Sequence, residues 1–370
     1  MAAPLKDSFG PEVAEYIAEL LGAVADDFPT DAFLDLCLDG YDELELRPRA
    51  QHIADALAEV LPTDGNTAVQ LIVDALRHEG EPQDLHGMEA FRYLPLSDFV
   101  GEHGLGHFDV SMVALREITM RFSAEFAIRP FLEQHTAATL DQCRAWTADE
   151  SEHVRRLVSE GTRPRLPWAP RLRMFMADPH PVVELLELLK DDDSEYVRRS
   201  VANCVNDIAK DHPDVAVDIA RRWWPGASVE RQRLVKHALR SLIKQGDVSA
   251  LEVIGYGGDS PLVTVASGCE PATVPIGSST HLWVDLHNPT DHQLGALVDF
   301  RVHFVKANGS TSPKVFKGAE IDVAPGATAT VRKKVSLKVH TTRTPYTGSH
   351  RVEVLINGDA HPLGVFDVTA

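Results

Sequence analysis

The chain has 370 residues, of which 44% are hydrophobic and 25% are charged, a balance typical of globular proteins that fold in water. No apolar run approaches the roughly 18 residues that a membrane-spanning helix needs, and the start, MAAPLKDSFG, lacks the apolar core of a secretory signal. The cysteines are scattered and form no Cys-x-x-Cys pair, which argues against a zinc knuckle and a disulfide framework. These features exclude membrane and disulfide-rich classes and predict a cytoplasmic protein of two domains or an elongated repeat array.

The net charge of −19 is unevenly distributed. Residues 1–150 hold 9 Lys/Arg against 29 Asp/Glu, whereas residues 151–258 hold 17 against 16 and residues 259–370 hold 10 of each. Within residues 151–173, six arginines stand against two glutamates. An acidic total slows the approach of nucleic acid, but a local basic stripe can still bind it. The charge therefore leaves DNA open as a partner and predicts a local, salt-sensitive contact.

The N-terminal part of the chain shows the apolar period of amphipathic helices. Apolar residues recur at three- and four-residue spacings from residue 11 to about residue 77. Two further helices are predicted over residues 109–121 and 130–146, the second with Pro130 in its first turn, where a missing N–H costs nothing. The acidic outer faces are typical of a solvated surface rather than of a binding site.

The helical pattern weakens between Gly80 and Gly106, where several prolines and glycines predict a long connection. His103 and His107 lie in this segment at a four-residue spacing. Two glycines separate them and no third ligand is near, so we expect no metal site here.

Similar helices recur along the chain, which is the signature of a helical solenoid. Val154-Arg-Arg is echoed by Val197-Arg-Arg 43 residues later, and Arg231-Gln-Arg-Leu-Val follows 34 residues after that. Spacings of roughly 34 to 47 residues between like helix pairs are typical of HEAT repeats, which curve and leave a concave face. Basic residues repeated in each unit would line this face, or else belong to a solvated outer face. They are Arg198, Arg199, Arg221, Arg222, Lys236, Arg240 and Lys244, the last three expected on one side of one helix.

Residues 154–168, VRRLVSEGTRPRLPW, combine a helix end with a stiff basic segment. The helix is predicted to end at Gly161, after which two prolines fix the backbone and present Arg163, Arg165 and Trp168 outward. Arginine forks match phosphates, and an indole offers a stacking face for a base. The alternative is a basic turn between helices with Trp168 as a core residue.

The apolar period changes from 3.6 to 2 near residues 255–261. About seven short alternating segments follow, separated by turns such as Asn357-Gly358, and they predict a β-sandwich of immunoglobulin-like type. Cys269 is the one cysteine of this segment, so we expect no disulfide between the two sheets of the sandwich. We therefore expect two domains, residues 1–258 and residues 259–370.

One predicted strand of the sandwich and the turn after it concentrate positive charge. These residues are either edge-strand cations that block aggregation or contacts to the partner of the helical domain. They are Arg332, Lys333, Lys334, Lys338, His340 and Arg343.

Three stretches of the sequence resemble a known family. Ser123–Phe131 (SAEFAIRPF), Ser159–Trp168 (SEGTRPRLPW) and Val197–Pro213 (VRRSVANCVNDIAKDHP) are similar to the AlkC branch of the HEAT-repeat DNA alkylation-repair glycosylases. The resemblance extends over nearly the whole chain, because some members of that branch carry a C-terminal immunoglobulin-like domain. The expected fold class is thus multidomain α and β, with an N-terminal all-α HEAT-like helical solenoid followed by a C-terminal immunoglobulin-like β-sandwich.

The resemblance implies an activity and its partners. It implies a monofunctional glycosylase that hydrolyses the N-glycosidic bond of N3-alkylated bases, chiefly 3-methyladenine and 3-methylcytosine, in duplex DNA without full base flipping. Such an enzyme starts base excision repair in the bacterial cytoplasm at the nucleoid, as a monomer without an obligate protein partner, a membrane, a metal or an organic cofactor. The competing interpretation is a non-enzymatic acidic HEAT scaffold that binds a protein partner.

The resemblance also implies site residues. By position, Glu125, Trp168 and Asp207 match the active-site carboxylates and indole of the family. An N3-alkylated base is a cationic leaving group, so carboxylates need only stabilise the oxocarbenium and orient a water, while the indole faces the positive charge. The residues expected to bind DNA are Arg155, Arg156, Arg163, Arg165, Arg199, Lys236, Arg240, Lys338 and Arg343.

The two carboxylates differ in how well the sequence alone supports them. Asp207 falls at the border of an apolar helix face, near a helix C-terminus, where its charge opposes the helix dipole. A residue disfavoured at its position is a candidate for function. Glu125 has a plainer alternative, an ion-pair bridge to Arg121 and Arg129 at four residues on either side.

Overall fold

The computed structural model describes residues 5–81, 87–258, 260–339 and 344–370. The chain forms two compact units, Met1–Asp211 and His212–Ala370. The expected domain boundary between residues 258 and 259 lies inside the second unit, close to the change from helices to strands, and stays a prediction. No helix in the described part of the chain is long and apolar enough to cross a membrane.

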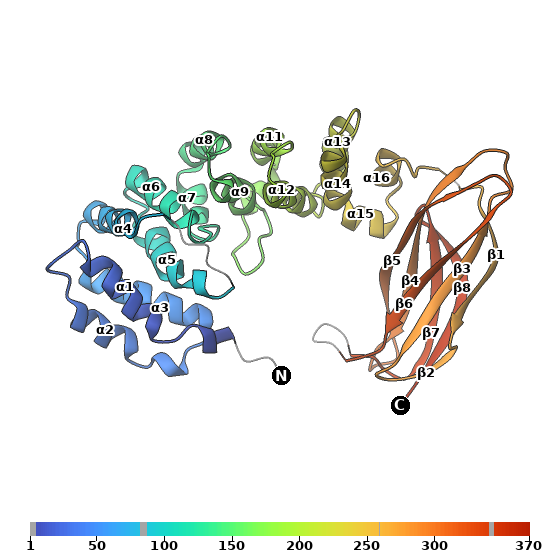
Figure 1. The fold of residues 1–370 in the computed structure, drawn as a ribbon, viewed down its shortest axis with the longest axis horizontal. Coiled ribbons are helices and arrows are strands. Elements are labelled where there is room, and N and C mark those ends of the chain that lie inside the picture. The colour runs from blue at the N-terminus through green and yellow to red at the C-terminus, as the bar shows by residue number, and fades with distance from the viewer. Residues whose placement is uncertain (1–4, 82–86, 259, 340–343) are drawn as a thin grey trace. The chain divides into compact units, whose positions relative to one another are not determined.

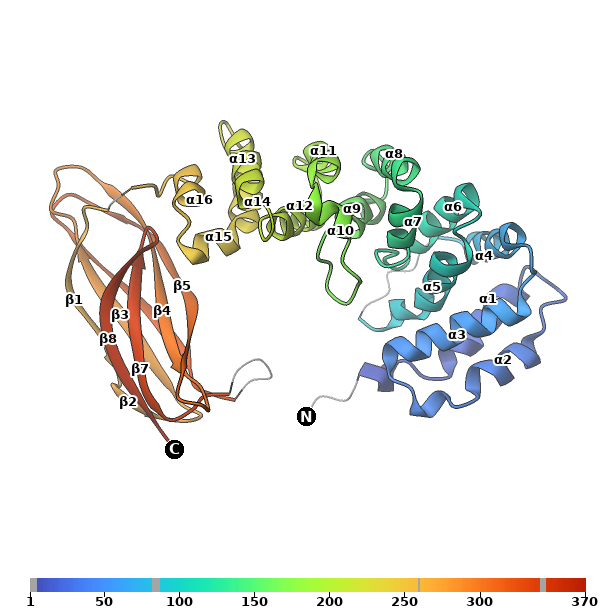
Figure 2. The same cartoon turned by 180° about the vertical axis from the view of Figure 1, so that it is seen from behind.

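The first unit is built from helices (Figure 1). Helices α8 and α11 form one row, and α9 and α12 form a second row beside it (Figures 1 and 2). Neighbouring pairs such as α9 and α12 pack directly on one another. The α-helices are α1 (Glu12–Gly22), α2 (Thr30–Leu38), α3 (Leu46–Val60), α4 (Gly65–Glu79), α5 (Leu94–His103), α6 (Phe108–Thr119), α7 (Ile128–Gln134), α8 (Thr136–Trp146), α9 (Glu152–Gly161), α10 (Arg173–Ala177), α11 (His180–Leu189) and α12 (Glu195–Ile208).

Repeated ion pairs tie one helix pair to the next. Arg116 on α6 binds Asp149 at 2.7 and 3.1 Å. Arg155 on α9 binds Asp192, which lies 43 residues after Asp149, at 2.6 and 3.0 Å. Each aspartate also accepts a backbone N–H two residues later and so shapes the turn that opens the next helix. The helical repeat expected from the sequence is confirmed.

Two helix boundaries differ from the expectation. The segment predicted as a long connection contains α5, whose residues Leu94–Gly101 are all buried. Because these residues are buried on every side of the helix, the sequence shows no alternation of polar and apolar faces that would predict a helix. The helix expected over residues 130–146 is broken at His135, whose backbone leaves the helical region (φ −123°, ψ 45°). Pro130 does lie in a first turn, that of the short helix α7.

The second unit combines helices with two β-sheets (Figure 1). The first sheet has the strand order β1-β3-β6 and the second has β2-β8-β7-β4-β5, with β2 parallel to β8. A core of aliphatic and Phe side chains fills the sandwich, and Phe300 and Phe366 are fully buried in it. The elements are α13 (Pro213–Trp223), α14 (Val229–Ala238), α15 (Arg240–Gln245), α16 (Val248–Val253), β1 (Val263–Glu270), β2 (Thr273–Pro275), β3 (Ser279–His287), β4 (Leu294–Val305), β5 (Thr311–Val323), β6 (Thr328–Ser336), β7 (Gly348–Ile356) and β8 (Asp359–Thr369).

The sandwich confirms the predicted strand alternation and its turns. Asn357 and Gly358 both have positive φ, as a tight turn between β7 and β8 requires. Cys269 is a free thiol. The basic strand is β6, at the edge of its sheet, and Lys338 is exposed just after it. The predicted contact Arg343, with the rest of residues 340–343, lies outside the described residues.

Gly161, the last residue of α9, permits close packing of α9 on α7. A Cβ at this position would lie 2.5 Å from Cγ2 of the buried Ile128. We expect Gly161→Ala to lower the free energy of unfolding by about 1–3 kcal/mol, because the helices must separate. Gly22→Ala is the matched control, since Gly22 also ends a helix but its Cβ would meet nothing within 4 Å. Urea unfolding that gives equal stability for both variants would contradict this account.

Candidate functional site

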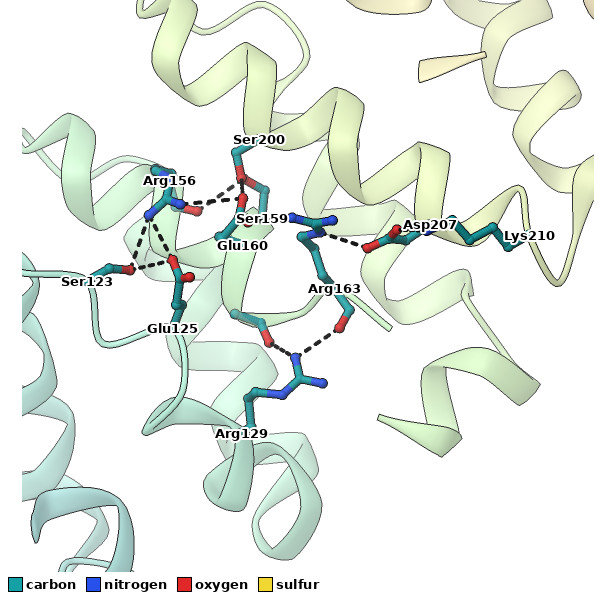
Figure 3. A network of polar contacts seen from close by, with 11 residues as sticks. Ser123, Glu125, Arg129, Arg156, Ser159, Glu160, Arg163, Ser200, Asp207 and Lys210 are labelled. Carbon is teal, nitrogen blue, oxygen red and sulfur yellow. Dashed lines mark hydrogen bonds and ion pairs between the residues drawn. The ribbon is translucent and has the colours of Figure 1, made fainter. Parts of the chain in front are cut away.

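Charged side chains of alternating sign form a continuous chain across the first unit (Figure 3). It begins before α7, crosses α9 and ends at the C-terminus of α12. In order, its members are Glu125, Arg156, Glu160, Arg163, Asp207 and Lys210. Two of the predicted catalytic residues, far apart in sequence, are therefore joined in one polar network.

Asp207 is the most enclosed carboxylate of this network, with 1% of its side chain exposed. Its Oδ2 accepts a hydrogen bond of 2.8 Å from Nε of Arg163, and its Oδ1 accepts one of 2.6 Å from Nζ of Lys210. Burial disfavours the charge on Arg163, but the hydrogen bond that it donates to Asp207 and the charge of Glu160 outweigh burial and raise the pKa of the guanidinium above its usual range. Asp207 is thus held between two cations.

Glu160 lies at the centre of the network, although the sequence did not single it out. Its Oε1 accepts a hydrogen bond of 2.6 Å from Arg163, and its Oε2 accepts one of 2.6 Å from Ser200. The same Oε2 lies 3.7 Å from a guanidinium nitrogen of Arg156. Ser200 in turn accepts a hydrogen bond from Ser159 at 2.7 Å. A signal was available, because Glu160 stands in the last turn of α9 and opposes the helix dipole as Asp207 does on α12.

Glu125 is paired differently from the expected bridge. Arg156 lies 3.0 Å from its Oε2, and Ser123 donates to the same oxygen at 2.8 Å. The bridge to Arg121 and Arg129 is wrong, because Arg121 points to acidic residues of α4 and α6 instead. At 15% exposure, the side chain of Glu125 is more open than that of Asp207.

Arg156 also stacks on an aromatic ring. Its guanidinium carbon lies 5.0 Å from the ring centroid of Tyr196 on α12. Burial disfavours its charge, but Glu125 and Glu160 raise the pKa of Arg156 above its usual range. Arg156 is therefore fixed by Glu125, Glu160 and Tyr196, and it connects α9 to the segment before α7 and to α12.

Residues 162–172, here called the α9–α10 loop, are held by hydrogen bonds from the side chain of Arg129. Its Nη1 donates to the carbonyls of Gly161 and Arg163 at 2.9 Å each, and its Nη2 donates to that of Pro170 at 2.5 Å (Figure 3). Burial lowers the pKa of Arg129 to about 10. The expected stiffness of the loop thus comes from a buried arginine as well as from its prolines.

The loop does not present Arg163 and Arg165 outward, which corrects the prediction. Arg163 turns inward to Glu160 and Asp207, and Arg165 makes a two-point ion pair with Asp211 at 2.8 and 2.6 Å. The prediction failed because both arginines form ion pairs with carboxylates of the protein itself, which are abundant in an acidic chain.

Trp168 does point outward, and the alternative of a core residue is wrong. Its side chain is 74% exposed, and its backbone has φ +65°, a conformation rare for a bulky residue. Such strain costs on the order of 1–3 kcal/mol and is concentrated at functional sites.

The other predicted DNA contacts of the first unit divide into two kinds. Arg155 is bound to Asp192 and to the backbone carbonyls of residues 149 and 150. It therefore connects the turns before α9 and α12. Arg199 on α12 is exposed. DNA binding by either stays a prediction, with Arg199 the better placed.

In the second unit, Lys236 and Arg240 lie on different helices, because the backbone between α14 and α15 leaves the helical region at Leu239. The prediction that Lys236, Arg240 and Lys244 share one side of one helix is therefore wrong. Lys236 lies 2.5 Å from Glu320 on β5, and Arg240 donates to a backbone carbonyl one turn earlier.

The site has the composition for charge stabilisation. Among the described residues, no cluster of three His, Cys, Asp or Glu side chains could hold a metal ion. His103, one of the pair considered from the sequence, instead stacks near Phe99 on α5, with ring centroids 4.9 Å apart. Three carboxylates, joined to one another through Arg156 and Arg163, can stabilise a positive charge and orient a water.

The fold and the site define a helical-repeat protein with a polar carboxylate site and an immunoglobulin-like sandwich. The family model of the C-terminal Ig-like domain of the uncharacterised protein YhaZ matches residues 264–370. The uncharacterised protein YhaZ of Bacillus subtilis (strain 168) is 35% identical over 358 residues, which cover 96% of this chain and 97% of the relative.

A solved structure matches the whole chain. It is the alkylpurine DNA glycosylase AlkC of Pseudomonas fluorescens, bound to DNA containing an abasic site analogue, with 35% identity, full coverage of both chains and a TM-score of 0.89. The chain therefore belongs to the AlkC branch of the HEAT-repeat DNA alkylation-repair glycosylases, as its motifs predicted.

Arg163 is expected to be the main structural cation of the site. Arg163→Ala leaves Glu160 and Asp207 buried without their shared partner, which costs about 3–5 kcal/mol of unfolding free energy. Arg165→Ala is the control on the same loop, and a much smaller loss is expected because its pair is more exposed. The measurement is urea unfolding of both variants. Equal losses would show that the buried network does not depend on Arg163.

Proposed function

We propose that this protein is a monofunctional DNA glycosylase that releases N3-alkylated adenine and cytosine from duplex DNA by hydrolysis, without full base flipping. One observation carries the proposal: Glu125, Glu160 and Asp207, on the three segments that resemble the family, are gathered into one network by Arg156 and Arg163. The AlkC relative, solved with DNA that contains an abasic site analogue, supports DNA as the partner. We place this repair in the cytoplasm, at the nucleoid.

The alkylated base supplies much of the activation itself. Alkylation at N3 makes the base cationic, so it departs as a neutral molecule and needs no strong general acid. The electron-poor C1′ of the sugar then carries the developing positive charge. Preorganised carboxylates stabilise that charge without the reorganisation that water would require.

The two predicted carboxylates suit different tasks. Glu125 is the more open one, and its Oε2 is already oriented by Ser123, so it suits the positioning and deprotonation of water. Asp207 is enclosed and suits electrostatic stabilisation of C1′. Lys210 neutralises it in the free protein, but the side chain of Lys210 is 44% exposed. A DNA phosphate can compete for this ammonium and so strengthen the negative field of Asp207 when DNA binds.

The decisive assay measures bases released from methylated DNA by chromatography. We expect 3-methyladenine and 3-methylcytosine above the level of a buffer blank, and single-turnover rates reduced by about 10² to 10⁴ for Asp207→Asn and Glu125→Gln, because each loses a charge that the transition state needs. Glu184→Gln, an exposed glutamate on α11, is the matched control and should retain the wild-type rate.

Two results would contradict this proposal. Release no faster than the blank would favour the alternative of a non-enzymatic scaffold. Activity of Asp207→Asn and Glu125→Gln within a few-fold of wild type, with stability measured in parallel, would remove the network from the chemistry.

Arg199 is expected to contact a DNA phosphate, because it is exposed on the helix that carries Asp207. Arg199→Ala should then reduce the slope of log K against log salt by about 0.9. Arg144→Ala is the control, since Arg144 is also exposed but lies on α8 in the other row of helices. Titrations of duplex DNA at several salt concentrations measure both slopes. An unchanged slope for Arg199→Ala would remove it from the interface.

A further inference from the structure

Tyr196, in the first turn of α12, lies beside the ion network without being part of the hydrophobic core. It is 42% exposed. Its ring meets two residues of α9: the edge of His153, with ring centroids 5.7 Å apart, and the guanidinium of Arg156, whose carbon lies 5.0 Å from the ring centroid. Residues 153 and 156 lie three positions apart and so share one side of α9. Tyr196 thus packs on α9 at the position of Arg156, while much of its ring stays open to solvent.

Arg156 divides its two terminal nitrogens between two carboxylates. Its Nη1 lies 3.0 Å from Oε2 of Glu125 and donates a hydrogen bond of 3.1 Å to Oγ of Ser123 (Figure 3). Its Nη2 lies 3.7 Å from Oε2 of Glu160. The ring of Tyr196 adds a contact of another kind, from the π face of an aromatic side chain.

The neighbouring Arg155 shows why this additional contact matters. Arg155 binds the single carboxylate of Asp192 through two nitrogens, at 2.6 and 3.0 Å. A two-point pair of this kind fixes the orientation of a guanidinium by its own geometry. Arg156 is instead drawn towards two glutamates at once, so its orientation needs a further restraint. The ring of Tyr196 provides this restraint.

The two carboxylate oxygens of Glu125 have different surroundings. Oε2 accepts a hydrogen bond of 2.8 Å from Ser123 and lies 3.0 Å from Arg156. Oε1 has no hydrogen-bond or ion-pair partner in the part of the chain that the structure describes, and it keeps accessible surface. Because the side chain of Glu125 is 15% exposed, Oε1 is the oxygen that a water can reach. The direction of Oε1 therefore depends on the groups that hold Oε2.

We propose that Tyr196 is a positioning residue for base excision. Its ring holds the guanidinium of Arg156, Arg156 fixes Oε2 of Glu125, and Oε1 is thereby aimed at the water that attacks C1′. The inference rests on the proposed function, in which Glu125 positions and deprotonates this water. Tyr196 acts through Arg156 and needs no contact with the DNA for this role.

The first test is single-turnover release of 3-methyladenine from methylated duplex DNA, with the enzyme concentration varied to separate the saturating rate from the half-saturating concentration. Tyr196→Ala should lower the saturating rate about tenfold and leave the half-saturating concentration within about twofold, because DNA still binds but Glu125 is no longer held. Tyr196→Phe keeps the ring and should retain the saturating rate within about twofold. Leu188→Ala, which truncates a 54% exposed residue of α11, is the matched control and should behave as wild type does.

An NMR measurement tests the geometry without any reaction. The side-chain Nε–H of Arg156, assigned by its absence in Arg156→Lys, should show restricted motion by ¹⁵N relaxation in wild type and in Tyr196→Phe. The same group should move more freely in Tyr196→Ala. The Nε–H of Arg155, which donates to Asp192 at 2.6 Å, is the internal control and should stay restricted in all three proteins.

Three results would overturn the positioning role. They are a saturating rate of Tyr196→Ala within about twofold of wild type, an equal loss in Tyr196→Phe, which would assign the effect to the hydroxyl, and unchanged motion of Arg156 in Tyr196→Ala. A wild-type protein that releases no base would remove the proposed function and the positioning role with it. An active wild type with an unaffected Tyr196→Ala would remove the positioning role alone.

Discussion

The ion chain from Glu125 to Lys210 is the interaction on which the candidate site of the first unit depends. It joins the segment before α7 to α9 and α12 through Arg156 and Arg163. Buried ion pairs contribute little net stability, because desolvation offsets most of the attraction. Three enclosed carboxylates are therefore poorly explained as a way to stabilise helices that already pack through aliphatic faces. Their presence is better explained by a need for carboxylates held in fixed positions at one place.

Two strained or costly features lie near this chain and support the same view. Trp168 adopts a positive φ although its side chain is exposed, so core packing does not explain the strain. Asp98 on α5 keeps a buried oxygen that has no hydrogen-bond partner among the residues that the structure describes. Arg129 connects these features, because it holds the backbone of the loop that carries Trp168 and lines, together with Asp98, a cavity of about 220 Å³ beside that loop. The loop and this cavity are thus parts of one rigid arrangement.

Periodicity predicted most of the fold, because amphipathic helices and alternating strands leave a direct mark on the sequence. It failed at α5, which is buried all round and so has no polar face. The site was predicted in part. Asp207 is marked in the sequence by a charge that opposes its helix dipole, and Glu160 carries the same mark in the last turn of α9. The inward turn of Arg163 could not be predicted, because its partner Asp207 lies 44 residues away in sequence and pairing depends on tertiary packing.

The arginines of the basic stretch show why local charge is a weak guide to DNA contacts in an acidic protein. Arg155, Arg163 and Arg165 each bind a carboxylate of a neighbouring turn or helix, so their charges are largely neutralised within the fold. The cations that stay available to a phosphate include the exposed Arg171, Arg173 and Arg199 and the half-exposed ammonium of Lys210 beside Asp207. With a net charge of −19, general attraction to DNA is weak. Binding should then depend on few, well-placed cations, and the approach of DNA to Lys210 would couple binding to the exposure of the Asp207 charge.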